Sequence, residues 1–271
     1  MNSFQTLSCS LAEWNGSFST FMKQLDKDKV PYLSYSKISC VETCEYRYFL
    51  EYVKGVKVRE PLYFKKGKIF HQTASMVHRQ LAKGKLNRKP IVRLVDRHFA
   101  YEDNRHLQNA IELLVQNVHS GFKLVATELP FVLSLGRDLP PLIGIIDLLL
   151  SKGDVFLVVD HKTGKNFYNQ DRLQLHLYQE YVRRTFKPKR LLACFDEYRW
   201  VNNLQRIRVP AFRRTNVSYT IKSWIKSFER IQNGHKMIQR VEHTGKANSG
   251  DSCYACHFNS VCDHFGFGST W

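Results

Sequence analysis

Residues 144–165 have the sequence GIIDLLLSKGDVFLVVDHKTGK, which predicts two adjacent strands joined by a tight turn. The first apolar run is interrupted by Asp147, and the second ends at Asp160. Between them lies a turn sequence centred on Lys152-Gly153, where glycine can adopt a positive φ. Two aspartates therefore interrupt or end strands that are otherwise apolar.

A two-residue hairpin loop at Lys152-Gly153 would bring these aspartates together. It would pair Asp147 with Val158 and Asp160 with Ile145. The aspartates would then be diagonal neighbours on one face of the sheet, roughly 5–8 Å apart. At this separation both carboxylates can bind one divalent cation.

Lys162 extends this group. Alternate residues of a strand share a face, so Lys162 points the same way as Asp160. Two buried carboxylates repel each other unless a cation lies between them, and Mg²⁺ or Mn²⁺ prefers such oxygen ligands. The lysine could orient a water molecule and stabilise charge on a phosphate. The alternative, a surface ion pair between Asp160 and Lys162, explains Asp147 poorly.

The remaining sequence predicts helices around a central sheet, which is an α/β or α+β core. Helices are expected at 34–53, 67–81, 95–119, 171–185 and 219–241. Strands are expected at 122–135, 142–150, 155–160, 191–201 and 205–209, with a basic loop at 83–93. We expect residues 1–33 to be an N-terminal arm or an extra helix, and residues 34–271 to be one domain.

The charge balance favours a polyanionic partner. Lys plus Arg number 41 and Asp plus Glu 24, which gives a formal net charge of +17. The excess lies in four clusters, within residues 57–68, 83–97, 183–190 and 206–214. A basic surface binds nucleic acid with release of counterions, and a basic protein without such a partner is the plain alternative.

Neither a membrane span nor a secretory signal is expected. No apolar run approaches the roughly 18–20 residues of a membrane helix. Residues 1–25 lack the charged start and apolar stretch of a secretory signal. The seven cysteines are an odd number, which argues against a disulfide framework and for a reducing compartment such as the cytoplasm.

Three cysteines form a compact motif, Cys253-x2-Cys256-x5-Cys262, which supplies three of the four ligands that a metal site needs. The fourth ligand must come from elsewhere. Cys40 and Cys44, one helical turn apart, are the candidates. Histidines near the motif leave a zinc site with mixed ligands open.

The motifs around the hairpin resemble those of a known nuclease family. Gly144-x-x-Asp147 followed by Asp160-x-Lys162-Thr-Gly-Lys165 resembles the signature of the RecB-like branch of PD-(D/E)xK nucleases. Glu128 resembles the acidic residue that precedes this signature. Gly67-Lys-Ile-Phe-His71 and Gln174-Leu-His-Leu-Tyr178 resemble the histidine helix and the Q-x-x-x-Y helix of that branch.

This resemblance implies a fold and a set of roles. The fold is α/β, a restriction-endonuclease-like central mixed sheet flanked by helices, with a C-terminal iron–sulfur clasp. The implied metal ligands are His71, Asp147, Asp160 and the main-chain carbonyl of His161. The other implied catalytic residues are Lys162, which assists the water, together with Glu128, Gln174 and Tyr178.

Iron–sulfur members of this branch, which include the AddB subunit and the CRISPR-associated exonucleases, are similar to this chain in their cysteines. They have one cysteine before the nuclease motifs and three after them. The resemblance selects Cys44, Cys253, Cys256 and Cys262 as ligands of a 4Fe-4S cluster. In that family a proline often follows the first cysteine, whereas here Glu45 does. Zinc stays open as the alternative.

The sequence therefore predicts a metal-dependent deoxyribonuclease, and the resemblance implies an exonuclease that acts on single-stranded or other DNA ends. The alternative from another class is a non-catalytic nucleic-acid-binding module with a structural zinc site. Such a module would keep the basic charge and the cysteines but would need neither Asp147 nor Lys162.

Overall fold

A computed structural model describes residues 7, 10–11, 17–98, 101–202, 208–241, 246–247, 253–254 and 256–264, apart from the side chains of 101–104 and 106. The chain divides into two compact units. The first comprises Met1–Pro61, Phe131–Gly144 and Ile221–Trp271, and the second comprises Leu62–Pro130 and Ile145–Thr220.

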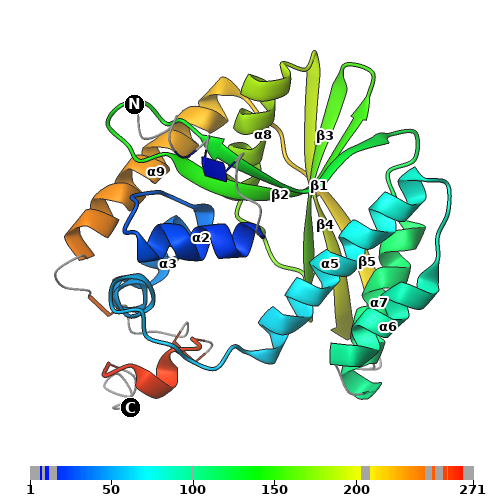
Figure 1. Ribbon diagram of the computed structural model, residues 1–271, viewed down its shortest axis with the longest axis horizontal. Coiled ribbons are helices and arrows are strands. Elements are labelled where there is room, and N and C mark those ends of the chain that lie inside the picture. The colour runs from blue at the N-terminus through cyan, green and yellow to red at the C-terminus, as the bar shows by residue number, and fades with distance from the viewer. Residues whose placement is uncertain are drawn as a thin grey trace. The chain divides into compact units, whose positions relative to one another are not determined.

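The strands form one mixed sheet of five, in the order β1-β2-β3-β4-β5 (Figure 1). They are β1 (Lys123–Leu133), β2 (Leu142–Lys152), β3 (Val155–Gly164), β4 (Arg190–Asn202) and β5 (Arg208–Asn216). The pairs β2–β3 and β4–β5 are antiparallel, whereas β3–β4 is parallel. A mixed sheet with flanking helices confirms the predicted α/β class.

The β2–β3 hairpin turns one residue later than predicted. Lys152 pairs with Val155, so the two loop residues are Gly153 and Asp154. Gly153 has φ +57, and two-residue hairpin loops of the primed types need a positive φ at this first position. The glycine therefore begins the loop instead of ending it.

This shift changes the pairing of the two aspartates. The predicted partnership of Asp147 with Val158 is wrong, because the ladder places Leu148 opposite Val159. Asp147 and Asp160 are the next residues beyond that pair on their strands. The two aspartates therefore occupy directly opposite positions on the two strands of the hairpin, instead of diagonal ones.

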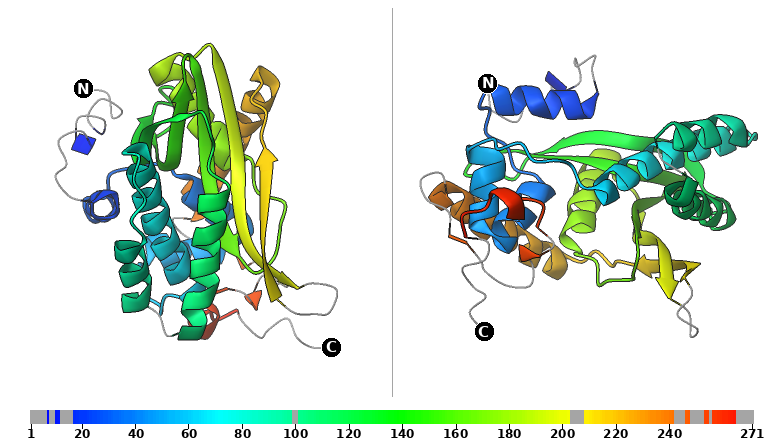
Figure 2. Two further views of the ribbon diagram at one scale, coloured as in Figure 1. Left: turned by 90° about the vertical axis from the view of Figure 1, so that its right-hand side faces the viewer. Right: turned by 90° about the horizontal axis from the view of Figure 1, so that it is seen from below.

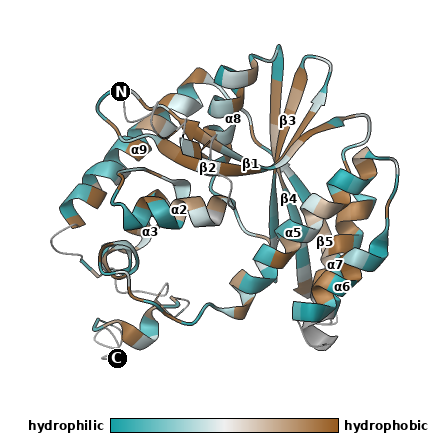
Figure 3. Ribbon diagram, in the orientation of Figure 1, coloured by the Kyte–Doolittle hydropathy of each residue, from teal (hydrophilic) through white to brown (hydrophobic). Residues whose placement is uncertain are grey.

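Helices of the second unit cover the sheet. α5 (Leu62–Ala82), α6 (Arg88–His98) and α7 (Tyr101–Gln116) lie side by side, as Figure 2 shows. α8 (Leu173–Phe186) contacts β3 and β4. Figure 3 shows β2 as hydrophobic along most of its length, as expected for a strand buried on both faces.

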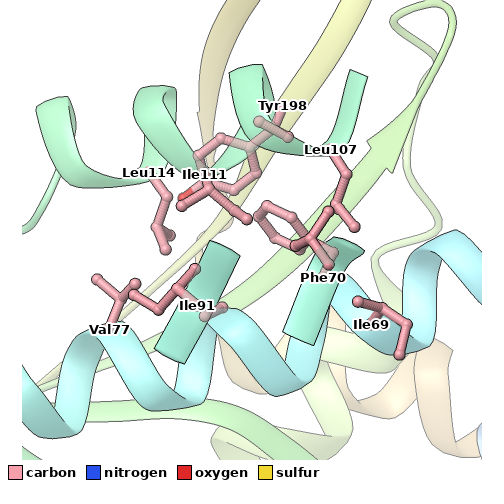
Figure 4. Close-up of a cluster of buried hydrophobic side chains, with 11 residues drawn as sticks. Ile69, Phe70, Val77, Ile91, Leu107, Ile111, Leu114 and Tyr198 are labelled. Carbon is pink, nitrogen blue, oxygen red and sulfur yellow. The ribbon is translucent and has the colours of Figure 1, made fainter. Parts of the chain in front are cut away.

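A buried core fixes α5 against β4. Phe70, Ile91, Leu114 and Tyr198 meet there from three helices and the sheet (Figure 4). Burying each such side chain stabilises the fold by about 1.5–3 kcal/mol. Because Phe70 is fully buried, it also sets the direction of His71, the next residue on α5.

The predicted basic loop and the predicted single helix after it are wrong. The structure has two helices there, and α6 already begins at Arg88. Asn87 caps α6, since its Oδ1 accepts a hydrogen bond from the Lys89 main-chain N–H at 3.0 Å. Pro90 lies in the first helical turn, where its missing N–H costs nothing.

The predicted helix 34–53 is broken at Cys44. It consists of α3 (Tyr35–Thr43), α4 (Glu45–Tyr48) and a π-helical turn, η1 (Phe49–Val53). Cys44 is extended, with φ −161 and ψ 113, and its thiol accepts a hydrogen bond from the Arg47 main-chain N–H at 3.4 Å. A cysteine thus interrupts the helix and caps the next one.

In the first unit, α3 packs closely on α9 (Ile221–Val241). A Cβ on Gly234 would lie 2.9 Å from Ile38 Cγ2, so only glycine permits this contact. Arg230 and Glu42 form an ion pair at 2.6 Å between the same helices. The unit also contains α2 (Phe18–Lys27) and the short helix η3 (Asn259–Val261).

Some expectations concern residues outside the described set. Within the expected arm 1–33, residues 18–27 form α2, whereas 1–6, 8–9 and 12–16 lie outside the description. Within the expected strand 205–209, the description begins again at Arg208, where β5 starts. No helix in the described parts of the chain is both long and apolar enough to cross a membrane.

Candidate active site

Three elements bring His71, Glu128 and Asp147 together. They come from α5, β1 and β2. The Nδ1 atom of His71 lies 3.4 Å from Asp147 Oδ2 and 3.9 Å from Glu128 Oε1. One ligand atom from each residue lies within 4.8 Å of the other two. This cluster has the spacing of a metal site.

Asp160 and Lys162 adjoin this cluster at the end of β3. The Nζ atom of Lys162 lies 2.7 Å from Asp160 Oδ2, and Asp160 is only 1 % exposed. The main-chain N–H of His161 donates to Asp147 Oδ2 at 2.8 Å, which ties the two strands together here. The two aspartates and the lysine therefore occupy one site.

α8 supports Lys162 from the other side. Gln174 Oε1 accepts a hydrogen bond from Lys162 Nζ at 2.7 Å. Its amide Nε2 donates to the Tyr178 hydroxyl at 2.8 Å. Because positions i and i+4 share a helix face, both side chains face the site, and together they fix the lysine.

The electrostatics show a crowded group of negative charges. Burial opposes the charged form of His71, but Asp147 outweighs it and raises the pKa of His71 to about 9. Burial would raise the pKa of Asp147, but His71 lowers it to about 2. Burial raises the pKa of Asp160 to about 6 despite Lys162. Burial and Asp147 raise the pKa of Glu128 to about 7.

These donors fit a hard divalent cation. The Oδ1 atom of Asp160 is buried and has no hydrogen-bond partner among the described residues, which is costly for a carboxylate oxygen unless a cation takes that place. Glu128, Asp147 and His71 form the group of ligand atoms, and Asp160 is close enough to affect and be affected by their charges. An oxygen-rich set of this kind suits Mg²⁺ or Mn²⁺.

Glu128 has a left-handed backbone conformation, which no sequence pattern predicted. Its φ is +52, which is uncommon for a residue other than glycine and costs on the order of 1–3 kcal/mol. The residue lies within β1 and interrupts the regular strand backbone close to Pro130. Such strain is often kept where a side chain must point at a functional site.

His78 is a neighbour of the site that motif spacing missed. It lies two helical turns after His71, and its ring stacks on His161 at 5.6 Å with an angle of 10° between the planes. Burial lowers the pKa of His78 to about 3 and that of His161 to about 4, so both rings are neutral. Repetition of histidine on one helix face was the available signal.

The four predicted cluster cysteines all belong to the first unit. Tyr46, two residues after Cys44, donates its hydroxyl hydrogen to Asp263 Oδ2 at 2.9 Å and meets the His264 ring at 4.5 Å. Asp263 directly follows Cys262. The helix of the first cysteine therefore contacts the segment of the last. Four cysteine thiolates are the ligands that an iron–sulfur cluster would need.

A second cluster on the same sheet has metal-ligand atoms but does not fit a cation. His119, Cys194 and Asp196 have ligand atoms within 4.8 Å of one another. However, Arg214 binds both Asp196 oxygens, at 2.7 and 2.8 Å, and His119 Nε2 lies 2.9 Å from Oδ2. Burial would raise the pKa of Asp196, but Arg214 and His119 lower it to about 2. The charge is already compensated.

Sequence comparison identifies the class of this site. The profile of the PD-(D/E)XK nuclease superfamily matches residues 32–263. The chain belongs to that superfamily, and its α/β fold is the restriction-endonuclease-like one that the motifs implied. Membership of this superfamily indicates a nuclease, whose substrate is nucleic acid.

One solved structure supports the same fold. A protein from Eubacterium rectale named "putative exonuclease" is 12% identical, with a TM-score of 0.58, over 89% of this chain and 93% of that one. SSO0001 is 11% identical with a TM-score of 0.35, over 74% of this chain and 95% of that one. No curated protein matches the sequence.

Proposed function

We propose that this protein is a divalent-metal-dependent deoxyribonuclease that acts as an exonuclease on single-stranded DNA ends. The observation that carries the proposal is the convergence of His71, Asp147 and Asp160 beside Lys162. The basic charge of +17 supports a phosphate-backbone partner. The name of the Eubacterium rectale protein supports attack at ends.

In this proposal His71, Asp147 and Asp160 hold the cation, with the His161 carbonyl and Glu128 as further ligands. When bound, Mg²⁺ or Mn²⁺ would polarise the scissile phosphate and lower the pKa of water towards neutrality. The ammonium of Lys162 then orients the attacking water and stabilises charge on the phosphate oxygens. Gln174 fixes the lysine, and Tyr178 fixes the glutamine.

A cleavage assay tests this proposal. End-labelled single-stranded DNA, circular single-stranded DNA, duplex DNA and RNA are incubated with Mn²⁺ or Mg²⁺, and with EDTA. We expect loss of the linear single strand only, in either metal and not in EDTA. Asp160→Ala should abolish cleavage, whereas Asp154→Ala, a surface aspartate paired with Lys189, should not. Binding without cleavage, unchanged in Asp160→Ala, would instead favour a non-catalytic module.

We also propose that Cys44, Cys253, Cys256 and Cys262 hold a 4Fe-4S cluster. The contact of Tyr46 with the segment after Cys262 supports this assignment. A thiolate cluster also requires a reducing compartment, which favours the cytoplasm.

Cys40 is the weaker candidate for the fourth ligand. Burial raises the pKa of its thiol to about 12, so it resists forming the thiolate that a metal needs. Its Sγ lies 3.9 Å from Glu51 Oε2, which further disfavours a negative sulfur.

Anaerobic purification tests the cluster. We expect a brown protein with about four iron and four sulfide per chain and no zinc. Cys44→Ser and Cys253→Ser should lose the colour and the folded structure, whereas Cys40→Ser should keep both. Stoichiometric zinc in a colourless wild type would replace the cluster with a zinc site.

A further inference from the structure

The loop that joins β3 to α8 is anchored by two arginines. Arg213 Nη2 donates to the Tyr168 main-chain carbonyl at 2.6 Å. Arg199, which is 5 % exposed, donates to the Thr163 carbonyl. Both guanidinium groups pair with Glu197, at 2.6 and 2.7 Å, and Glu197 is fully buried. An ion network around a buried glutamate therefore holds the start and the middle of the loop.

Two further contacts tighten this anchor. Gln170 Nε2 donates to Glu197 Oε1 at 2.8 Å, so the far end of the loop is tied to the same carboxylate. Gly164 has φ +143, and a Cβ there would lie 2.7 Å from Arg199 Nη1. The lack of a side chain at Gly164 leaves room for this guanidinium beside the chain, two residues after Lys162.

The side chain of Tyr168 does not share this burial. It is 58 % exposed, although its main-chain carbonyl is fixed by Arg213. Its hydroxyl accepts one long hydrogen bond, from Asn166 Nδ2 at 3.5 Å, and Arg199 lies 5.8 Å from its ring centroid. An aromatic ring on an anchored loop that stays open to solvent can stack on a flat ligand.

The surroundings indicate what this ligand carries. Arg213 keeps 40 % of its side chain exposed, and Lys165 and Arg172 on the same loop are exposed too. Tyr168 follows Lys162 by six residues, which keeps it within about 20 Å of that lysine along the chain. Cations around an aromatic ring match a nucleic acid strand, with phosphates for the cations and a base for the ring.

We propose that Tyr168 stacks on an unpaired base of the DNA end and thereby sets the preference for single strands. The proposal rests on the nuclease function proposed above and adds a specificity-determining residue to it. Inside duplex DNA each base already stacks on both of its neighbours, so only the terminal base pair offers a free face to the ring. A single strand presents such faces at every nucleotide.

Kinetics of Tyr168→Ala and Tyr168→Phe test the inference. With Mn²⁺ and single-stranded DNA, Tyr168→Ala should raise KM about tenfold with kcat changed less than about twofold, because stacking contributes to binding. Tyr168→Phe should restore the wild-type KM, since the ring suffices. Phe186→Ala is the matched control, an exposed aromatic at the opposite end of α8, and should leave KM unchanged.

An abasic strand separates stacking from charge. Binding of a fluorescent oligonucleotide is measured in EDTA, with normal or abasic nucleotides at its end. The wild type should lose about tenfold affinity on the abasic strand, and Tyr168→Ala should lose none. Equal losses in both proteins would overturn the inference. Equal binding of RNA and DNA would leave stacking intact and extend the ligand to either strand.

The two proposals fail differently. If the wild type cleaves single strands but Tyr168→Ala keeps the wild-type KM and abasic discrimination, the stacking inference alone is wrong. If no metal restores cleavage in the wild type, the nuclease function fails, while binding in EDTA still reports on Tyr168.

Discussion

Two groups of buried carboxylates lie on the same sheet and differ in one respect. Asp196 and Glu197 on β4 are 1 % and 0 % exposed, and arginines satisfy both carboxylates. Asp160 on β3 is equally buried, at 1 %, yet its Oδ1 has no hydrogen-bond partner in the part of the chain that the structure describes. Burial therefore does not distinguish the carboxylate that we propose as a cation ligand, whereas incomplete pairing does. The first group stabilises the fold, and the second leaves a place for a cation.

The largest expected effect is on Asp160. Asp160→Asn should lower the cleavage rate at least about a thousandfold, because a cation ligand is lost. The metal-free protein should be no less stable, since a carboxylate that repels Asp147 is removed. Rates with saturating Mn²⁺ and melting curves in EDTA check both halves. Cleavage within tenfold of wild type would contradict this role.

The next effect concerns Glu197, where we expect a loss of stability instead of a direct loss of cleavage. Glu197→Gln leaves the buried Arg199 without its charged partner and should cost about 3 kcal/mol of unfolding free energy. Glu112→Gln is the control, since its pair with Arg88 is exposed and should contribute under about 0.5 kcal/mol. Urea unfolding measures both. Equal losses would mean that burial of the pair does not matter.

Proton release on metal binding is a further difference between the carboxylates of the candidate active site and those of β4. His71, with a pKa of about 9 in the metal-free protein, must lose a proton to bind a cation. Mn²⁺ affinity should therefore rise about tenfold per pH unit from pH 7 to 9 and then level off. Below pH 7, Glu128 adds a second proton, whereas Asp196, with a pKa of about 2, adds none.

Calorimetric titration with Mn²⁺ in buffers of different ionisation enthalpy counts these protons. His71→Ala is the control, and it should bind Mn²⁺ more weakly with a flatter pH dependence above pH 7. Affinity that does not change with pH in the wild type would place the cation elsewhere.

The smallest effect concerns the residues that hold Lys162. Gln174→Ala should lower kcat about tenfold with little change in KM, because the lysine loses its fixed position. Tyr178→Phe should cost about threefold, since it removes only the acceptor for Gln174. Tyr181→Phe, on the same helix, is the control and should leave kcat unchanged. A lower affinity for Mn²⁺ in Gln174→Ala would instead indicate a ligand role.

Local rules explain how much of this site the sequence could predict. Alternation along β3 gave the shared face of Asp160 and Lys162, and helical spacing gave that of Gln174 and Tyr178. The hairpin register was wrong because the sequence alone allowed two assignments of the turn around Gly153. Because the turn lies one residue later than predicted, every residue of β2 pairs with a different residue of β3 than expected.

Features that depend on distant partners could not be predicted. The left-handed backbone of Glu128 has no glycine or asparagine to signal it. The break at Cys44 falls inside a sequence with good helical spacing. Glu197 gains its arginines from its own strand and from β5, and their pairing depends on the β4–β5 register. Each of these is decided by tertiary contacts instead of local pattern.

The contact between Tyr46 and Asp263 has a consequence for synthesis of the chain. The two residues are 217 positions apart. At about 5–20 residues per second, a ribosome needs roughly 10–40 s to reach Asp263 after it has made Tyr46. During that interval the thiol of Cys44 exists before Cys253, Cys256 and Cys262 have been made. For the proposed cluster to form, the thiol of Cys44 must therefore stay reduced throughout this interval.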